Sequence, residues 1–237
     1  MENLWHKMSL DKSAHIILKD CMNLKNNERC LIVTDSKLKR IGKILYKNSL
    51  KTTRNSKLIL TTIPKTHGAE PPQKIAAEML KYDVIIMPTT KSLSHTRARE
   101  IASKKGARIA SMPGITFDMM KRALNIDFNK IKTLNNKLII KLKNKNKVRI
   151  KTKKGTDIEF YLKRRKWICD DGIYTKKKAF GNLPAGEIFI APIEGKTNGI
   201  IVVDASVGGL GKIDKNFIIN IKNGFIKNIR NGIVANK

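Results

Sequence analysis

The chain has 237 residues, of which 41% are hydrophobic, and its 49 Lys and Arg against 19 Asp and Glu give a formal net charge of +30 at pH 7. This hydrophobic fraction suffices for a folded core and excludes a disordered chain. No apolar run approaches the roughly 20 residues that a membrane span requires, and the charged residues within 1–12 do not fit a secretory signal. We therefore expect a cytoplasmic protein with no membrane partner.

The excess of basic residues suggests nucleic-acid binding, and the cysteines suggest a zinc site or disulfides. The rest of the sequence argues against each of these. Each cation placed on a phosphate can release a counterion, so a nucleic acid is a conceivable partner. Lys, Asn and Ile are abundant all along the chain, however, which favours a solvated basic surface over a binding stripe. Cys21, Cys30 and Cys169 lack C-x-x-C spacing, and we expect packed thiols rather than a zinc site or disulfides.

Helix and strand patterns alternate over the first half of the chain. Apolar residues at helical spacing predict a helix over 11–24 with Asp11 as its cap. Further helices are expected around 38–45 and over 72–81, 94–105 and 116–124, and strands over 29–34, 57–61, 83–87 and 107–111. Thr116 is predicted to cap the last of these helices. Strands separated by helices indicate a mainly parallel sheet with helices on both faces.

The pattern changes to strands and turns after about residue 127. Strands are predicted over 138–142, 147–152, 157–162, 188–190 and 200–203, followed by a hairpin turning at Asn223-Gly224. The basic run 141–149 is interpreted as the turn and outward face of one hairpin. We therefore predict an α/β protein with a doubly wound, mainly parallel N-terminal domain (residues 1–127) and a β-rich second domain (residues 128–237).

Two segments of the first half lie where an α/β fold could bind a ligand. The turn after the first strand, Thr34–Lys37, has none of the glycines that let a backbone approach a pyrophosphate, which argues against a dinucleotide. His95 follows the strand 83–87, at the edge where open α/β sheets place their ligands. It is either a residue of the helix start or a substrate-binding group, and we keep it as a weak candidate for substrate binding.

A proline-glycine turn in the second half delivers a carboxylate in a defined direction. Pro184 fixes its own backbone angle and Gly186 permits unusual ones, so Glu187 stands at the start of the strand that follows. Such a carboxylate can ligate a divalent metal or take a proton from bound water. Glu194 and Asp204 follow nearby, and each of the three can equally be a turn acid.

Around Glu187 the sequence resembles the aminopeptidase T family of metallopeptidases. The resemblance is most specific over residues 181–192 and 198–204, with support from 94–100 and 106–116, and it spans about residues 11–229. It implies an α/β domain, a β-rich catalytic domain, a homodimer, and a hydrolase that removes N-terminal amino acids from peptides. Proteolysis in that family uses two divalent metal ions, for which zinc or cobalt is expected.

The resemblance implies that Glu187 is a metal ligand, but it places the other ligands, a second Glu, two His, a Tyr and an Asp, beyond Lys237. We therefore expect an aminopeptidase-like chain that is partial or inactive. Two alternatives stay open. One is a non-catalytic basic module that binds nucleic acid or another anion. The other is a small-molecule hydrolase or ring-opening oxygenase on the same scaffold, and a requirement for ferrous iron would identify the oxygenase.

Overall fold

The computed structural model describes residues 2–163, 165–208 and 210–231. The chain divides into two compact units by its internal contacts. The first unit takes residues 1–136 and 169–187, and the second takes residues 137–168 and 188–237. The sequence predicted two domains that meet at residue 127. Units defined by internal contacts do not test that domain boundary, so it stays a prediction.

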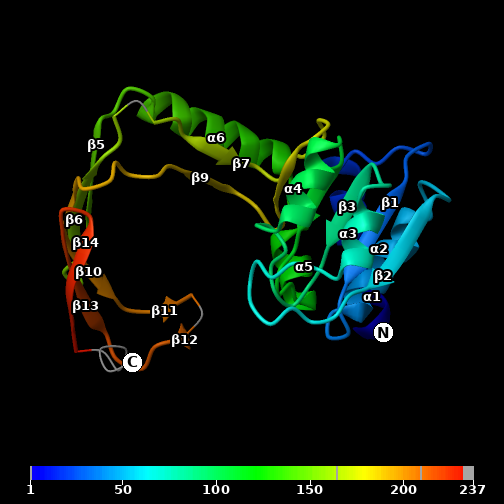
Figure 1. Ribbon diagram of the computed structural model, residues 1–237, viewed down its shortest axis with the longest axis horizontal. Coiled ribbons are helices and arrows are strands. Elements are labelled where there is room, and N and C mark those ends of the chain that lie inside the picture. Colours follow the sequence, from blue (N-terminus) through cyan, green and yellow to red (C-terminus); the bar gives the residue numbers. More distant parts are fainter. Residues whose placement is uncertain (1, 164, 209, 232–237) are drawn as a thin grey trace. The chain divides into compact units, whose positions relative to one another are not determined.

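A five-stranded parallel sheet in the order β2-β1-β3-β4-β8 forms the centre of the first unit (Figure 1). Its strands are β1 (Cys30–Thr34), β2 (Ser56–Leu60), β3 (Val84–Met87), β4 (Arg108–Ser111) and β8 (Phe180–Asn182). The helices are α1 (Glu2–Ile16), the π-helical segment η1 (Ile17–Cys21), α2 (Lys39–Ser49), α3 (Gln73–Met79), α4 (Arg97–Lys104), α5 (Phe117–Ala123) and the first part of α6 (Phe128–Leu142). This arrangement confirms the predicted doubly wound sheet.

Helices cover both faces of this sheet. Alternate residues of a strand point to opposite faces, so Ile32 joins a cluster that includes residues of α1, η1, α2 and α5, whereas Leu31 joins one that includes residues of α3 and α4. The apolar face predicted for residues 11–24 is buried as expected. Asp11 is not a cap, however: α1 begins at Glu2, and the Asp11 carboxylate accepts a hydrogen bond from the Asn48 amide at 2.7 Å.

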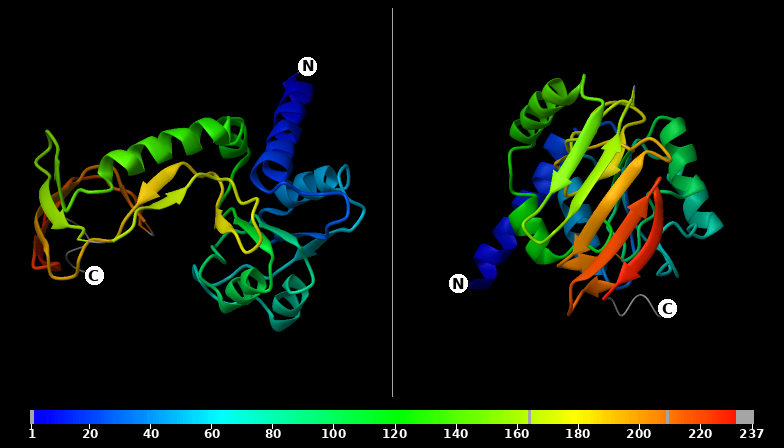
Figure 2. Two further views of the ribbon diagram at one scale, coloured as in Figure 1. Left: turned by 90° about the horizontal axis from the view of Figure 1, so that it is seen from above. Right: turned by 90° about the vertical axis from the view of Figure 1, so that its left-hand side faces the viewer.

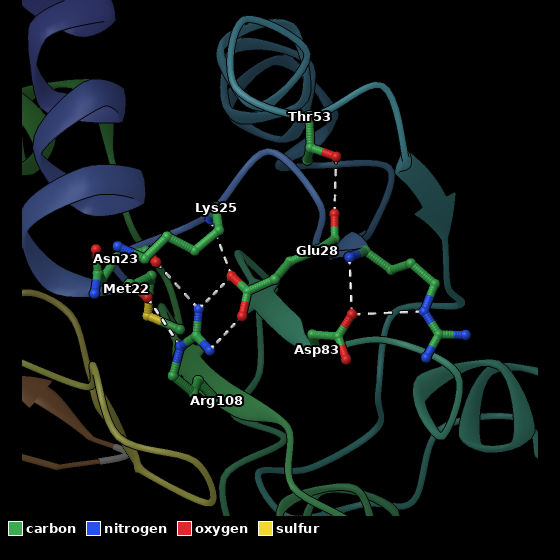
Figure 3. A network of polar contacts seen from close by, with 8 residues as sticks. Met22, Asn23, Lys25, Glu28, Thr53, Asp83 and Arg108 are labelled. Carbon is green, nitrogen blue, oxygen red and sulfur yellow. Dashed lines mark hydrogen bonds and ion pairs between the residues drawn. The ribbon is translucent and has the colours of Figure 1, made fainter.

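A buried ion pair fastens the amino end of the sheet (Figure 3). The Arg108 guanidinium donates to both carboxylate oxygens of Glu28, at 2.8 and 2.7 Å. It also donates to the carbonyls of Met22 and Asn23, at 2.9 and 3.3 Å. Only 7% of the Arg108 side chain is exposed. The arginine therefore ties β4 to both ends of the loop that precedes β1.

The second unit contains a five-stranded antiparallel sheet in the order β14-β13-β10-β6-β5, which Figure 2 shows face-on in its right-hand view. Its strands are β5 (Lys147–Lys151), β6 (Asp157–Tyr161), β10 (Thr197–Val203), β13 (Phe217–Lys222) and β14 (Phe225–Arg230), and a small pair, β11 (Ser206–Val207) and β12 (Gly211–Lys212), follows β10. The predicted hairpin is confirmed. Its turn residues Asn223 and Gly224 have φ angles of 53° and 77°, as a tight hairpin turn requires.

The strand predicted over 138–142 is wrong, because these residues form the end of α6. Short apolar runs fit either element, and here the helix is fixed by Phe128 and Asn135, which are both buried two turns apart on one face. The basic run is likewise not the turn of a hairpin, because Lys141 belongs to α6 and residues 143–146 join α6 to β5. Only its end, Lys147 and Arg149, lies on the β5–β6 hairpin, with side chains that are exposed. They pair with Glu159 and Asp157 at 2.8 and 2.7 Å.

Candidate active site

Three loops of the first unit meet at the carboxyl edge of its sheet, where β3, β4 and β8 end side by side. Strand pairing brings Met87, Ser111 and Asn182 into line. Beyond the strands, Gly114 N donates to Thr89 O at 2.8 Å, and Leu183 N donates to Ser111 O at 2.9 Å. This is the edge at which open α/β sheets bind ligands.

At this edge the buried carboxylate of Asp35 joins the loops that follow β1 and β3, the two strands between which the strand order reverses. Asp35 is fully buried and accepts four hydrogen bonds. Lys37 N and Leu38 N donate from its own loop, at 3.1 and 3.2 Å, and the amide and hydroxyl of Thr90 donate from the other loop, at 2.5 and 2.9 Å. Because a buried carboxylate occupies the position at which dinucleotide folds bind a pyrophosphate, the geometry explains the missing glycine motif.

The segment that carries His95 is held by polar contacts on both sides. The Glu70 carboxylate accepts hydrogen bonds from Arg97 N and Ala98 N, at 2.5 and 3.1 Å, and so satisfies free amides at the start of α4. His67 Nδ1 accepts from Ser92 N at 3.1 Å. The sequence analysis missed these residues because their partners lie far away in the chain. His95 itself is exposed, on a segment whose backbone is fixed.

The turn that carries Glu187 lies beside the His95 segment. The Ser94 hydroxyl donates to the Asn182 side-chain oxygen at 3.0 Å, which links the two segments directly. At the other end of the turn, the Asn135 amide donates to the carbonyl of Glu187 at 3.1 Å. Glu187 opens β9 (Glu187–Phe189), which pairs with β7 (Ile168–Asp170), and its side chain is exposed. The structure thus bonds the His95 segment to the end of β8, from which the turn toward Glu187 leaves, while Glu187 itself lies at the start of β9.

The side chain of Arg99 contacts both the segment that carries His95 and strand β8. The Arg99 guanidinium lies 4.1 Å from the centre of the Phe180 ring, and its Nε donates to the carbonyl of Ser94 at 2.7 Å. Burial lowers the pKa of Arg99. Since Phe180 belongs to β8 and Ser94 precedes α4, this stacked cation holds the His95 segment against the strand that leads into the Glu187 turn.

The described residues do not form a complete metal site. Within residues 2–163, 165–208 and 210–231, no three His, Cys, Asp or Glu lie close enough together to hold an ion. A single exposed carboxylate at Glu187 does not supply the several donors that tight binding needs. No helix in the described part of the chain is both long and apolar enough to cross a bilayer.

Comparisons with known proteins give the family. The model of the family "NicX: 2,5-dihydroxypyridine 5,6-dioxygenase" matches residues 17–237. The solved structure of 2,5-dihydroxypyridine dioxygenase from Pseudomonas putida KT2440 is similar, with a TM-score of 0.79 and 16% identity over 97% of this chain and 70% of that one. AmpT from Thermus thermophilus is also similar, with a TM-score of 0.70 and 13% identity over 97% of this chain and 73% of that one. No curated protein sequence matches the chain.

These findings overturn the identification as an aminopeptidase T family member. The likeness to AmpT extends to the fold alone, whereas the family match covers nearly the whole chain. Aminopeptidase activity and proteolysis are therefore wrong, and so is the alternative of a non-catalytic basic module. The comparisons do not test the expected partners, a peptide or a nucleic acid. A divalent metal is compatible with the family, but the choice of zinc or cobalt depended on the aminopeptidase resemblance. The homodimer and the role of Glu187 as a metal ligand stay predictions.

The fold is the predicted α/β fold, and the family is one of enzymes, described as dioxygenases rather than the expected hydrolases. The family model matches residues 17–237, and this range includes both the segment that carries His95 and the turn that carries Glu187. The chain belongs to the NicX family of 2,5-dihydroxypyridine 5,6-dioxygenases.

Proposed function

We propose that this chain forms the active-site scaffold of a ring-cleaving dioxygenase that acts on a small hydroxylated pyridine. The family match over residues 17–237 carries the proposal. The geometry supports it, since the loops after β3, β4 and β8 meet at the carboxyl edge of the sheet, and Ser94, next to His95, bonds there to Asn182, which precedes the Glu187 turn. The ring-opening oxygenase that the sequence left open is the alternative that this family favours.

The two candidate residues suit a hydroxylated ring. The imidazole of His95 has ring nitrogens that can donate to or accept from a ring hydroxyl, so it can exchange a proton with that hydroxyl. The Glu187 carboxylate can accept a hydrogen bond from a second hydroxyl or add one oxygen ligand to a metal. We assign His95 to proton exchange and Glu187 to holding the substrate edge. Because the described residues do not complete a metal site, no step through a metal is assigned.

The direct test is oxygen uptake by the purified chain with 2,5-dihydroxypyridine, with and without added ferrous iron. A dioxygenase consumes one O₂ for each ring opened, and both atoms of isotopically labelled O₂ enter the product. We expect this stoichiometry with the wild-type chain. We expect a fall of about 10²-fold or more in kcat/KM for His95→Gln, the usual scale for losing a general acid or base.

Two exposed residues of the same types serve as matched controls. His15→Gln changes an exposed histidine of α1, and Glu100→Gln changes an exposed carboxylate of α4 that pairs with Lys104. Both should react as the wild type does, while His95→Gln and Glu187→Gln should not. Absence of oxygen uptake in the wild type with ferrous iron present, or equal rates in all four variants, would contradict the proposal.

A further inference from the structure

The turn that carries Glu187 rests on a buried phenol. Tyr174 is 5% exposed, and its Oη lies 2.5 Å from Asp170 Oδ1 and 2.6 Å from the carbonyl oxygen of Asn182. Its backbone N–H donates to the carbonyl of Cys21 at 2.7 Å, in the core of the first unit. The phenol is therefore anchored independently of the turn that it contacts.

The protons around this phenol can be counted. A tyrosine hydroxyl has one proton, and both a carboxylate and a peptide carbonyl are acceptors only. With Asp170 ionised, the phenol could donate to just one of two oxygens that both lie at hydrogen-bonding distance. Both contacts are satisfied if Asp170 carries a proton and donates to Tyr174, which in turn donates to Asn182. Burial raises the pKa of Asp170 by more than the hydrogen bonds with Tyr174 and the Asn182 backbone lower it, and the net rise agrees in direction with this count.

The same aspartate also holds the far end of the turn. Gly186 N donates to the backbone carbonyl of Asp170 at 3.0 Å, so Asp170 contacts one end of the turn through Tyr174 and the other end directly. The chain keeps a glycine beneath the phenol, because a Cβ on Gly181 would lie 2.3 Å from the Tyr174 hydroxyl. Each of these residues lies in the first unit.

We propose that Tyr174 and a protonated Asp170 are positioning residues, which fix the Asn182–Glu187 turn and so orient Glu187 toward the substrate edge. This inference deepens the proposed function and rests on it for the role of Glu187. The hydrogen-bonded chain from Asp170 through Tyr174 to Asn182 is a property of the fold, and it can be tested without activity.

Amide hydrogen exchange of residues 182–187, followed by mass spectrometry, is the primary test. Tyr174→Phe keeps the ring but removes the hydroxyl, and we expect about tenfold faster exchange in this segment, the scale of one or two lost hydrogen bonds. Tyr82→Phe is the matched control, because the Tyr82 hydroxyl also contacts a carboxylate. That carboxylate belongs to Glu78 of α3 and lies at 3.3 Å. It should leave the exchange of residues 182–187 unchanged.

Two substitutions at Asp170 test the proton count. Asp170→Asn retains a donor toward the phenol and should preserve the slow exchange of residues 182–187, whereas Asp170→Leu should accelerate it as Tyr174→Phe does. Equal acceleration in both Asp170 variants would show that the ionised carboxylate is the acceptor and would overturn the protonated chain. Unchanged exchange in Tyr174→Phe would overturn the positioning role, and if that variant does not fold, Asp170→Leu decides in its place.

A kinetic comparison separates this inference from the proposed function. If the wild type takes up oxygen, Tyr174→Phe should lower kcat for 2,5-dihydroxypyridine, whereas Asp170→Asn should retain most of the wild-type kcat. A kcat for Tyr174→Phe equal to that of Tyr82→Phe would contradict positioning. If the wild type takes up no oxygen, the proposed function fails, and the exchange experiment still decides whether the two residues hold the turn.

Discussion

The sheet of the first unit is covered on both faces, whereas the sheet of the second unit has few buried residues. Ile32 and Leu31 point to opposite sides of β1, and both are fully buried. In the second unit Ile158 and Phe217 are 6% and 4% exposed, but Ile226 at one edge is 60% exposed. The same isoleucine-rich composition therefore produces a closed core in one unit and a thinly covered sheet in the other.

This difference explains why the candidate site belongs to the first unit. Catalytic groups need a support whose own side chains are fixed by packing and hydrogen bonds. The loops at the carboxyl edge have that support from Asp35 and Glu70, which bond to residues 55 and 28 positions away, and from Tyr174, which bonds to Asn182. Paired charges on β5 and β6 are instead exposed, and such pairs contribute little to stability.

The largest expected effect comes from breaking the buried pair at the amino end of the sheet. Arg108→Met leaves Glu28 and two carbonyls without their donor and should cost about 3–5 kcal/mol. Arg29 contacts Asp83 at 3.5 Å nearby but is exposed, so Arg29→Met should cost no more than about 1 kcal/mol. Urea unfolding followed by the helical circular dichroism band measures both, and equal losses would contradict this contrast (Figure 3).

A second pair of substitutions compares the two sheets directly. Ile86 is fully buried in the first unit, so Ile86→Ala should cost about 2–5 kcal/mol. The exposed Ile226 of β14 makes few contacts to lose, so Ile226→Ala should change stability by less than about 0.5 kcal/mol. The free energy of unfolding in urea tests both. A cost above 2 kcal/mol for Ile226→Ala would show that β14 is covered after all.

Loss of a helix cap in the first unit should have a smaller effect. Thr116 Oγ1 accepts a hydrogen bond from Met119 N at 3.1 Å, which confirms the cap predicted from the sequence. Thr116→Ala should cost about 1 kcal/mol, because one amide at the helix start loses its acceptor. Thr116→Ser keeps the oxygen and should be close to the wild type in thermal unfolding. If both variants lose equal stability, the cap is not the cause.

The smallest expected effect is the change with pH in the stability that the buried pair of Glu28 and Arg108 contributes. The hydrogen bonds from Arg108 lower the pKa of Glu28 below its usual 4.5. The stabilisation is therefore complete above pH 4.5 and is lost as the pH falls through the lower folded-state pKa. We expect the stability difference between the wild type and Arg108→Met to shrink as the pH falls below that value. A difference that does not shrink at any acidic pH at which the wild type still folds would contradict it, since Glu28 would then have kept its charge throughout.

Local patterns predicted features of both units correctly. The burial of Ile17 and Cys21, the cap at Thr116 and the hairpin turn at Asn223 follow from spacing and residue type alone. Strand β8 was missed, because Phe180-Gly181-Asn182 has no strand pattern of its own and is extended by pairing with β4. The contacts of Asp35 and Glu70 were missed for the same reason, since each joins residues that the sequence does not bring together.

The wrong family followed from a motif that marks a scaffold rather than a reaction. The block around Glu187 includes Gly181, which makes room for Tyr174, and Gly186, which bonds to Asp170. These residues build the turn, and a dioxygenase and AmpT both resemble the chain in fold. Fold and function separate in this way whenever different chemistry uses one framework.

The most direct test of a substrate site at this sheet edge is the amide NMR spectrum of the chain during titration with 2,5-dihydroxypyridine. We predict shifts that saturate together in residues 92–96 and 182–187, with the β13–β14 hairpin unchanged. The control variant His15→Gln should bind as the wild type does, and His95→Gln should lose the shifts near residue 95. Saturable shifts confined to the β13–β14 hairpin, or none in residues 92–96 and 182–187 at saturating ligand, would contradict the account.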